Sequence, residues 1–117
     1  MLFRSLVETL TETLVSHINF TNRLEHLALM DINLTAKAAG VIARSLHQTP
    51  NLRVLMLSSN PLGEGASDLT RHLSDVPDLK ELYLDDVKMT KKQVNNLTEA
   101  VRPSKIFWFQ SSYHVSV

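Results

Sequence analysis

The sequence predicts an α/β fold in which short parallel strands alternate with helices in a repeating order. Three segments of the 117-residue chain resemble one another, namely Leu24–Leu34, Leu52–Leu62 and Leu79–Met89, and each precedes a stretch with helical spacing of its apolar residues. Their first residues lie 28 and then 27 positions apart. A fixed period of about 20 to 50 residues is typical of stacked arrays, in which each unit buries its apolar face against its neighbours.

Each repeated segment opens with a strand pattern. Apolar residues occupy its first, fourth and sixth positions, and side chains in a strand alternate between the two faces. The fourth and sixth positions are therefore predicted to face a shared interior, at Leu27, Leu29, Leu55, Leu57, Leu82 and Leu84. A further apolar residue five positions later is predicted to return the chain to that interior, at Leu34, Leu62 and Met89.

The stretches between the strands are predicted to be helical. Residues 35–47 carry apolar residues spaced by three and four, and the second helix is expected after Gly65 as the shortest of three. The third is expected to begin at Thr90, where Gln93 completes a capping-box pattern that satisfies free backbone N–H groups. Its inward stripe is predicted to be Val94, Leu97 and Val101.

Both ends of the chain are predicted to be partial units of one domain, 1–117. Residues 1–23 are expected to form a partial helical unit, an amphipathic helix followed by a longer loop at residues 16–23. The uncovered leucines of that helix are expected either to pair two chains or to lie at the exposed end of a truncated array. Full repeats are predicted at 24–51, 52–78 and 79–105, followed by a terminal strand and tail at 106–117. In that last strand, Phe107 and Phe109 are expected to take the inward leucine positions.

The composition argues against several classes of function. Twelve basic residues balance twelve acidic ones, so neither nucleic acid nor an anionic membrane is expected as a partner. The chain has no cysteine, which excludes disulfides and thiolate metal sites and favours a reducing, cytoplasmic location. We expect no signal peptide and no membrane span.

No group of residues suggests catalysis. The five histidines share no ligand spacing, and no serine belongs to a motif with a positioned histidine and acid. No metal, no cofactor and no enzymatic activity is therefore expected. Glycosylation sequons begin at Asn19, Asn33 and Asn96, and we interpret them as accidental because the last falls within a predicted helix.

The repeated pattern resembles a known class of repeat. Residues 52–63, LRVLMLSSNPLG, follow the pattern LxxLxLxxNxL almost position for position. This pattern resembles the ribonuclease-inhibitor class of leucine-rich repeats, and it is most similar to the C-terminal repeats of NOD-like receptors. The resemblance implies a short leucine-rich-repeat solenoid, a right-handed β-α superhelix with about four parallel strands on its concave side and three or four helices on its convex side.

The same resemblance implies binding rather than catalysis. It implies a non-enzymatic, ligand-sensing protein–protein interaction module like the repeat part of a cytosolic innate-immune receptor. The alternative is a scaffolding or regulatory repeat domain that acts on the cytoskeleton or on small GTPases. The repeat class alone does not distinguish them, because function belongs to the site rather than to the fold.

The chain departs from this class at the ninth position of the repeat. The class usually has Asn or Cys there, to bond backbone groups in the turn after the strand. Here Asn60 complies, whereas Ile32 and Val87 occupy the equivalent places. The turns around Ile32 and Val87 are therefore expected to be held by apolar packing or by water.

The outward-facing strand positions predict where a partner would bind. In a parallel ladder, equivalent residues of successive strands align at intervals of about 4.8 Å, so they form columns across the concave face. The predicted columns are His26, Val54, Glu81 and Ile106; then Ala28, Met56, Tyr83 and Trp108; then Met30, Ser58, Asp85 and Gln110.

The second column is the strongest candidate for a protein-binding site. It ends in tyrosine and tryptophan, which are enriched at binding hot spots, and carboxylates flank it on the third repeat. We expect Met56, Tyr83 and Trp108 to anchor a protein partner, with the carboxylates selecting a basic rim. The alternative is that Trp108 and Tyr83 only cover one another at an edge strand, as part of a terminal cap.

Overall fold

The computed structural model describes residues 23–101 and 107–109, and in this part of the chain strands and helices alternate as the repeats predict. The elements in chain order are β1 (His26–Ala28), α2 (Ala36–Arg44), the 3₁₀ helix η1 (Leu46–Gln48), β2 (Val54–Met56), α3 (Gly65–His72), the 3₁₀ helix η2 (Leu73–Asp75), β3 (Glu81–Tyr83), α4 (Lys91–Val101) and β4 (Phe107–Phe109). The expected N-terminal unit lies outside the described residues apart from Arg23, so self-association through its helix stays a prediction.

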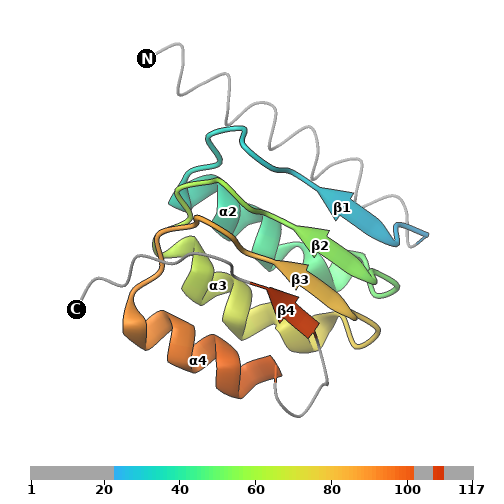
Figure 1. Cartoon of the computed structure of the whole chain (residues 1–117). Helices are drawn as coiled ribbons and strands as arrows, with labels where there is room; N and C mark the ends of the chain where they lie inside the picture. The colour runs from blue at the N-terminus through green and yellow to red at the C-terminus, as the bar shows by residue number, and fades with distance from the viewer. Residues whose placement is uncertain (1–22, 102–106, 110–117) are drawn as a thin grey trace.

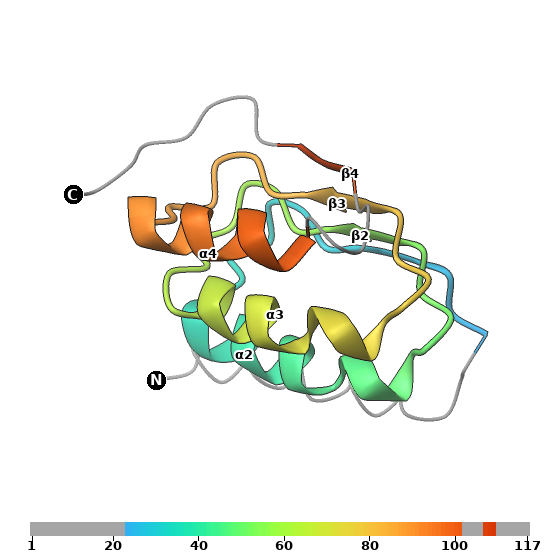
Figure 2. The same cartoon turned by 90° about the horizontal axis from the view of Figure 1, so that it is seen from below.

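The strands form one parallel sheet in the order β1–β2–β3–β4. A helix lies between consecutive strands in the chain, and α2, α3 and α4 all cover the same side of the sheet (Figure 1 and Figure 2). Backbone pairing continues past the strand ends, since the N–H of Leu29 donates to Met56 O at 2.8 Å and that of Leu57 to Tyr83 O at 3.0 Å. The result is a two-layer α/β arrangement.

The fourth strand pairs one residue away from the predicted alignment. The observed pairs are Glu81–Phe107, Leu82–Trp108 and Tyr83–Phe109. The predicted alignment of Trp108 with Tyr83, and of Phe107 with Leu82, is therefore wrong. Residues 106–109 are all apolar, so they lack the apolar–polar alternation by which a sequence specifies its register.

The core lies between the sheet and the helices and consists mainly of leucine. The inward strand residues Leu55, Leu82 and Leu84 are completely buried, while Leu29 is only partly buried at the edge of the same cluster. The later apolar position is buried as predicted, at Leu34, Leu62 and Met89. Burial of one such side chain stabilises the fold by about 1.5–3 kcal/mol, so the repeat pattern itself supplies the core.

Helix α2 begins and ends at identifiable residues. Thr35 is its N-cap, with extended backbone (φ −77°, ψ 170°) and a hydroxyl that accepts from the N–H of Ala38 at 3.3 Å. The α-helix ends at Arg44, three residues before the predicted limit, because the chain then tightens into η1. The helix is therefore shorter than its apolar spacing suggests.

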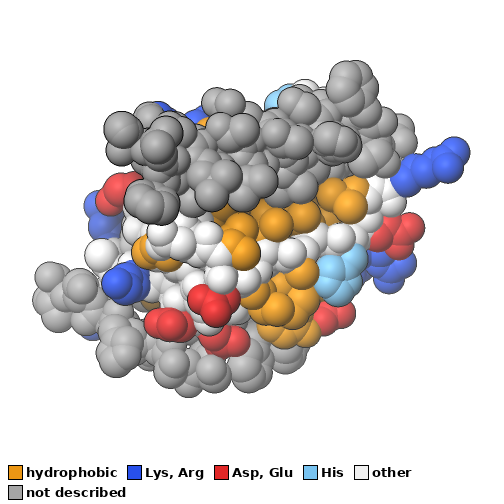
Figure 3. Space-filling model, turned by 90° about the horizontal axis from the view of Figure 1, so that it is seen from above, with side chains coloured by type: hydrophobic (Ala, Val, Ile, Leu, Met, Phe, Trp, Pro, Cys, Tyr) orange, Lys and Arg blue, Asp and Glu red, His pale blue; other side chains and the backbone are white. Residues whose placement is uncertain are grey.

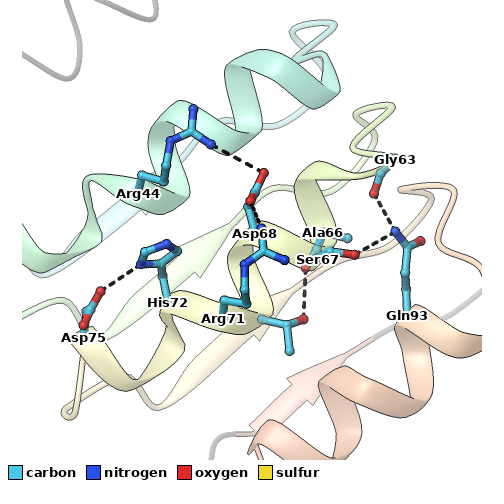
Figure 4. Close-up of polar contacts among 10 residues, drawn as sticks. Arg44, Gly63, Ala66, Ser67, Asp68, Arg71, His72, Asp75 and Gln93 are labelled. Carbon is cyan, nitrogen blue, oxygen red and sulfur yellow. Dashed lines mark hydrogen bonds and ion pairs between the residues drawn. The ribbon is translucent and has the colours of Figure 1, made fainter.

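Helices α2 and α3 pack closely because α3 begins with a glycine. A Cβ atom on Gly65 would lie 2.6 Å from the Cβ of Ala39 and 3.0 Å from Ala36 O, so no side chain fits there. Asp68 of α3 also pairs with Arg44 of α2 at 3.6 Å (Figure 4). Small residues thus set the distance between these two helices.

Helix α4 begins with the predicted capping box. The N–H of Thr90 donates to Gln93 Oε1 at 2.8 Å, and the N–H of Gln93 donates to Thr90 Oγ1 at 3.2 Å. The amide nitrogen of Gln93 also donates to Gly63 O at 3.0 Å and to Ser67 Oγ at 3.2 Å (Figure 4). One buried side chain therefore caps its own helix and ties it to the preceding repeat.

Candidate functional site

The turns that follow the strands share one backbone feature. The eighth position of each repeat has left-handed backbone, with φ between 54° and 62°, at Asp31, Ser59 and Asp86. In the first and third repeats the tenth position is left-handed as well, at Asn33 (φ 56°) and Lys88 (φ 59°). The middle repeat has Pro61 there, whose ring fixes a negative φ, so its turn follows a different course.

Asn60 holds the turn of the first repeat as well as its own. Its Oδ1 accepts from the N–H groups of Ile32 and Leu34, both at 3.0 Å. Its Nδ2 donates to Leu29 O at 2.6 Å and to Leu57 O at 3.0 Å. The expectation that the turn around Ile32 depends on apolar packing or water is therefore wrong, because the neighbouring repeat supplies its polar anchor.

The third turn is held in another way. Val87, at the ninth position, is completely buried, in agreement with the expected apolar packing. The hydroxyl of Ser58 also accepts from the N–H of Asp85 at 3.0 Å, across neighbouring strands. Ser58 is only 7% exposed, so the expectation that its side chain contributes to an outward surface is wrong.

The sheet side chains that point away from the helices form what we call the strand face. In the described part of the chain, its strand residues are His26, Ala28, Val54, Met56, Glu81 and Tyr83, all exposed or half-buried. Two predicted columns are present in register over three strands, because His26 pairs with Val54 and Val54 with Glu81, and likewise along the second column. The backbone of Trp108 pairs with Leu82 and so leaves the column that ends in Tyr83.

Tyr83 is held on the strand face by its neighbour. Its phenol donates to the Glu81 carboxylate at 2.5 Å. This hydrogen bond, followed by desolvation and by the negative charge of Glu81, raises the pKa of Tyr83 above its usual value near 10. The ring is therefore a neutral, oriented side chain at ordinary pH.

Beyond the strand ends, two large hydrophobic side chains are exposed in the described part of the chain. Met30, which the sequence placed in the outward columns, is 45% exposed, and Ile32 is 49% exposed. Ile32 was missed as a surface candidate, although an apolar residue at a turn position that usually holds Asn was a usable signal. Exposed hydrophobic and acidic side chains lie side by side on one face of the molecule (Figure 3).

Two hollows on the described surface are lined by polar side chains. One, of about 350 Å³, lies at the start of the strands and is lined by Glu25, Asn51, Arg53, Asp78 and Lys80. Another, of about 480 Å³, is lined by residues of α3 and α4 that include Glu64, Arg71, Lys92 and Gln93. Within residues 23–101 and 107–109, no group of three or more His, Cys, Asp or Glu side chains is placed to hold a metal ion.

Comparison with known proteins places the fold. The chain matches no family model. It is 32% identical over 87 residues to a ribonuclease inhibitor of Sus scrofa, a match that covers 73% of this chain and 19% of that protein. Among solved structures it is similar to leiomodin-1 actin-binding site 2, with a TM-score of 0.74 and 18% identity over 94% of this chain and 65% of that one. The fold is leucine-rich-repeat-like.

These comparisons support the coarser part of the expected resemblance. A distant relationship to ribonuclease inhibitor agrees with the predicted repeat class, whereas neither match supports the nearer resemblance to NOD-like receptors. By their names, the curated relative is an inhibitor and the similar structure is an actin-binding site, so both names describe binding to another molecule. In the described residues, no helix is long and apolar enough to cross a membrane. The chain spans about a fifth of the length of its curated relative.

Proposed function

We propose that the chain is a non-enzymatic protein-binding repeat module of the kind that regulates the cytoskeleton. The observation that carries this proposal is the similarity of fold to an actin-binding site over 94% of the chain. The relationship to ribonuclease inhibitor agrees with a protein as the partner. The likeness to the actin-binding site favours the cytoskeletal alternative over an immune-sensing role, for which the expected receptor resemblance has no support.

We assign the binding to the strand face. Met56 and Tyr83 are paired in register on neighbouring strands, and both are half-buried. The hydrogen bond from Tyr83 to Glu81 restricts the aromatic ring before a partner arrives, so binding loses less side-chain entropy. A tyrosine and a methionine held in this way are suitable anchors for a protein surface.

The proposal is tested with actin as the first probe. Wild-type protein is expected to sediment with actin filaments or to bind fluorescently labelled actin monomers, and the double substitution Met56→Ser with Tyr83→Ala is expected to weaken binding by about tenfold or more. Asn95→Ala is the matched control, because Asn95 is exposed on α4, away from the strand face.

The outcomes of the binding assay test the partner and the binding face separately. Failure to bind both actin monomers and filaments would overturn the cytoskeletal part of the proposal. Binding of a ribonuclease instead of actin would move the function toward that of the curated relative. A folded double variant that binds actin as well as wild type does would remove the strand face as the site.

A further inference from the structure

The turn of the first repeat presents two apolar side chains on either side of a carboxylate. In the described part of the chain, Met30 and Ile32 are the large hydrophobic residues with high exposure, at 45% and 49%. Asp31 lies between them and is exposed. Large apolar side chains on a water-exposed turn contribute nothing to the core, which makes them candidates for contact with another molecule.

This turn is rigid. Asp31 (φ 54°) and Asn33 (φ 56°) both hold left-handed backbone, a conformation that aspartate and asparagine tolerate better than other residues except glycine. Asn60 accepts from the N–H groups of Ile32 and Leu34 and donates to Leu29 O, so the turn is fixed at its beginning and at its end. A preorganised loop loses little conformational entropy on binding.

The neighbouring turns give this edge of the molecule a negative charge. The N–H of Asp31 donates to Ser58 O at 3.1 Å and that of Ser59 donates to Asp85 O at 2.7 Å, so the three turns follow one another along the ladder. At a strand spacing of about 4.8 Å, the first and third turns lie about 10 Å apart. Their charged residues are Asp31, Asp85, Asp86 and Lys88, three negative and one positive.

We propose that the turn formed by Met30, Asp31 and Ile32 binds a protein segment that carries large apolar side chains next to lysine or arginine. The apolar part of such a segment contacts Met30 and Ile32, and its basic groups lie near Asp31 and the carboxylates of the third turn. This inference rests on the proposed protein-binding function. It adds a second contact region beyond the strand face and specifies that the partner carries positive charge there.

The probe is a display library of random 16-residue peptides, selected for binding to the intact wild-type protein. We expect the enriched peptides to combine apolar residues with a net positive charge. The double substitution Met30→Ser with Ile32→Asn is expected to weaken the best peptide by about tenfold or more. This variant should fold, because both side chains are half-exposed and asparagine is the usual residue of this repeat class at the position of Ile32.

The charge of the partner is tested separately. Asp31→Asn keeps a residue that tolerates left-handed backbone and removes only the charge. It is expected to weaken the same peptide about two- to fivefold at low salt and to reduce the salt dependence of binding. An affinity that is the same for the wild type and for Asp31→Asn at low salt would overturn the electrostatic part of the proposal.

Methyl NMR on the methionines separates this inference from the proposed function. Met30 reports on the turn, Met56 on the strand face, and Met89, which is only 1% exposed, is an internal control. Peptide addition is expected to shift the Met30 methyl signal and to leave Met89 unchanged. A shift at Met56 without one at Met30 would overturn the turn as a contact region and keep the strand face. A library that yields no binding peptide would overturn the turn as a contact region, whereas the proposed function is decided by the actin assay.

Discussion

Replacement of Asn60 by alanine is expected to be the most damaging change of a polar residue in the described part of the chain. Asn60 is 1% exposed, and its amide bonds backbone groups in two repeats. Alanine would leave at least two N–H groups, those of Ile32 and Leu34, without their partner. A buried polar group left without a hydrogen bond costs about 1–3 kcal/mol, so the expected loss is about 2–6 kcal/mol.

The assay is urea unfolding followed by circular dichroism. Domains of this size have unfolding free energies of about 5–15 kcal/mol, so such a loss is a large part of the total. With a slope of about 1.5 kcal/mol per M, a loss of about 3 kcal/mol lowers the urea midpoint by about 2 M. Asn95→Ala, on the exposed side of α4, serves as the control and should change the midpoint very little. A midpoint for Asn60→Ala close to that of the control would refute the anchoring role.

Asn60→Asp distinguishes hydrogen bonding from simple cavity formation. The introduced carboxyl can still accept from Ile32 and Leu34, but it has no N–H to offer to Leu29 O and Leu57 O. Burial beside two carbonyl oxygens raises its pKa in the folded state above the unfolded value of about 3.9. The variant should therefore lose stability as pH rises from about 4 to 7 and recover part of it on acidification. A destabilisation independent of pH would contradict this reasoning.

Three further predictions follow from other parts of the structure. Gly65→Ala should destabilise the fold by about 1–3 kcal/mol in urea unfolding, since its Cβ would lie 2.6 Å from that of Ala39; a neutral effect would mean that α2 and α3 can move apart freely. Lys88→Gly should raise stability by up to about 1 kcal/mol relative to Lys88→Ala, because φ is 59° and only glycine adopts that region without a Cβ penalty; equal stabilities would argue against strain there. Glu81→Gln should lower the pKa of Tyr83 toward 10, which can be measured from the ring carbon shift by NMR. Because that pKa is raised in the folded state, the stability that it contributes is present below pH 10 and is lost as pH rises through the folded pKa. An unchanged titration of Tyr83 in the variant would contradict the role of the carboxylate.

The repeated part of the fold could be predicted because each repeat contains the same spacing of apolar residues. Alternation over LxxLxL specifies which strand residues face the helices, and Leu55, Leu82 and Leu84 are completely buried as a result. The capping box at Thr90 and Gln93 could be predicted for a similar reason, since both partners lie within one helical turn. Local patterns determine these features, so they are visible in a single sequence.

Features that depend on contacts between repeats could not be predicted in the same way. The amide of Asn60 reaches Ile32, 28 residues earlier in the chain, and no local pattern indicates that reach. The hydroxyl of Ser58 likewise accepts from the N–H of Asp85, 27 residues later in the chain, and no local pattern indicates that contact. The alignment of β4 was predicted wrongly because four consecutive apolar residues, 106–109, fit more than one register. In the observed register Trp108 pairs with Leu82, so it does not continue the predicted column that contains Tyr83.

The two buried amides have a consequence for how the protein unfolds. Asn60 joins the second repeat to the first at the ends of the strands, and Gln93 joins the third repeat to the second at the start of a helix. In a linear array, stability is the sum of the units and of the contacts between neighbours, and weak contacts allow one unit to open alone. Here each junction has a polar link that is lost as soon as either of its repeats opens, so the opening of one repeat alone costs these hydrogen bonds. The described repeats should therefore open as one cooperative unit, with similar protection of their core amides against hydrogen exchange.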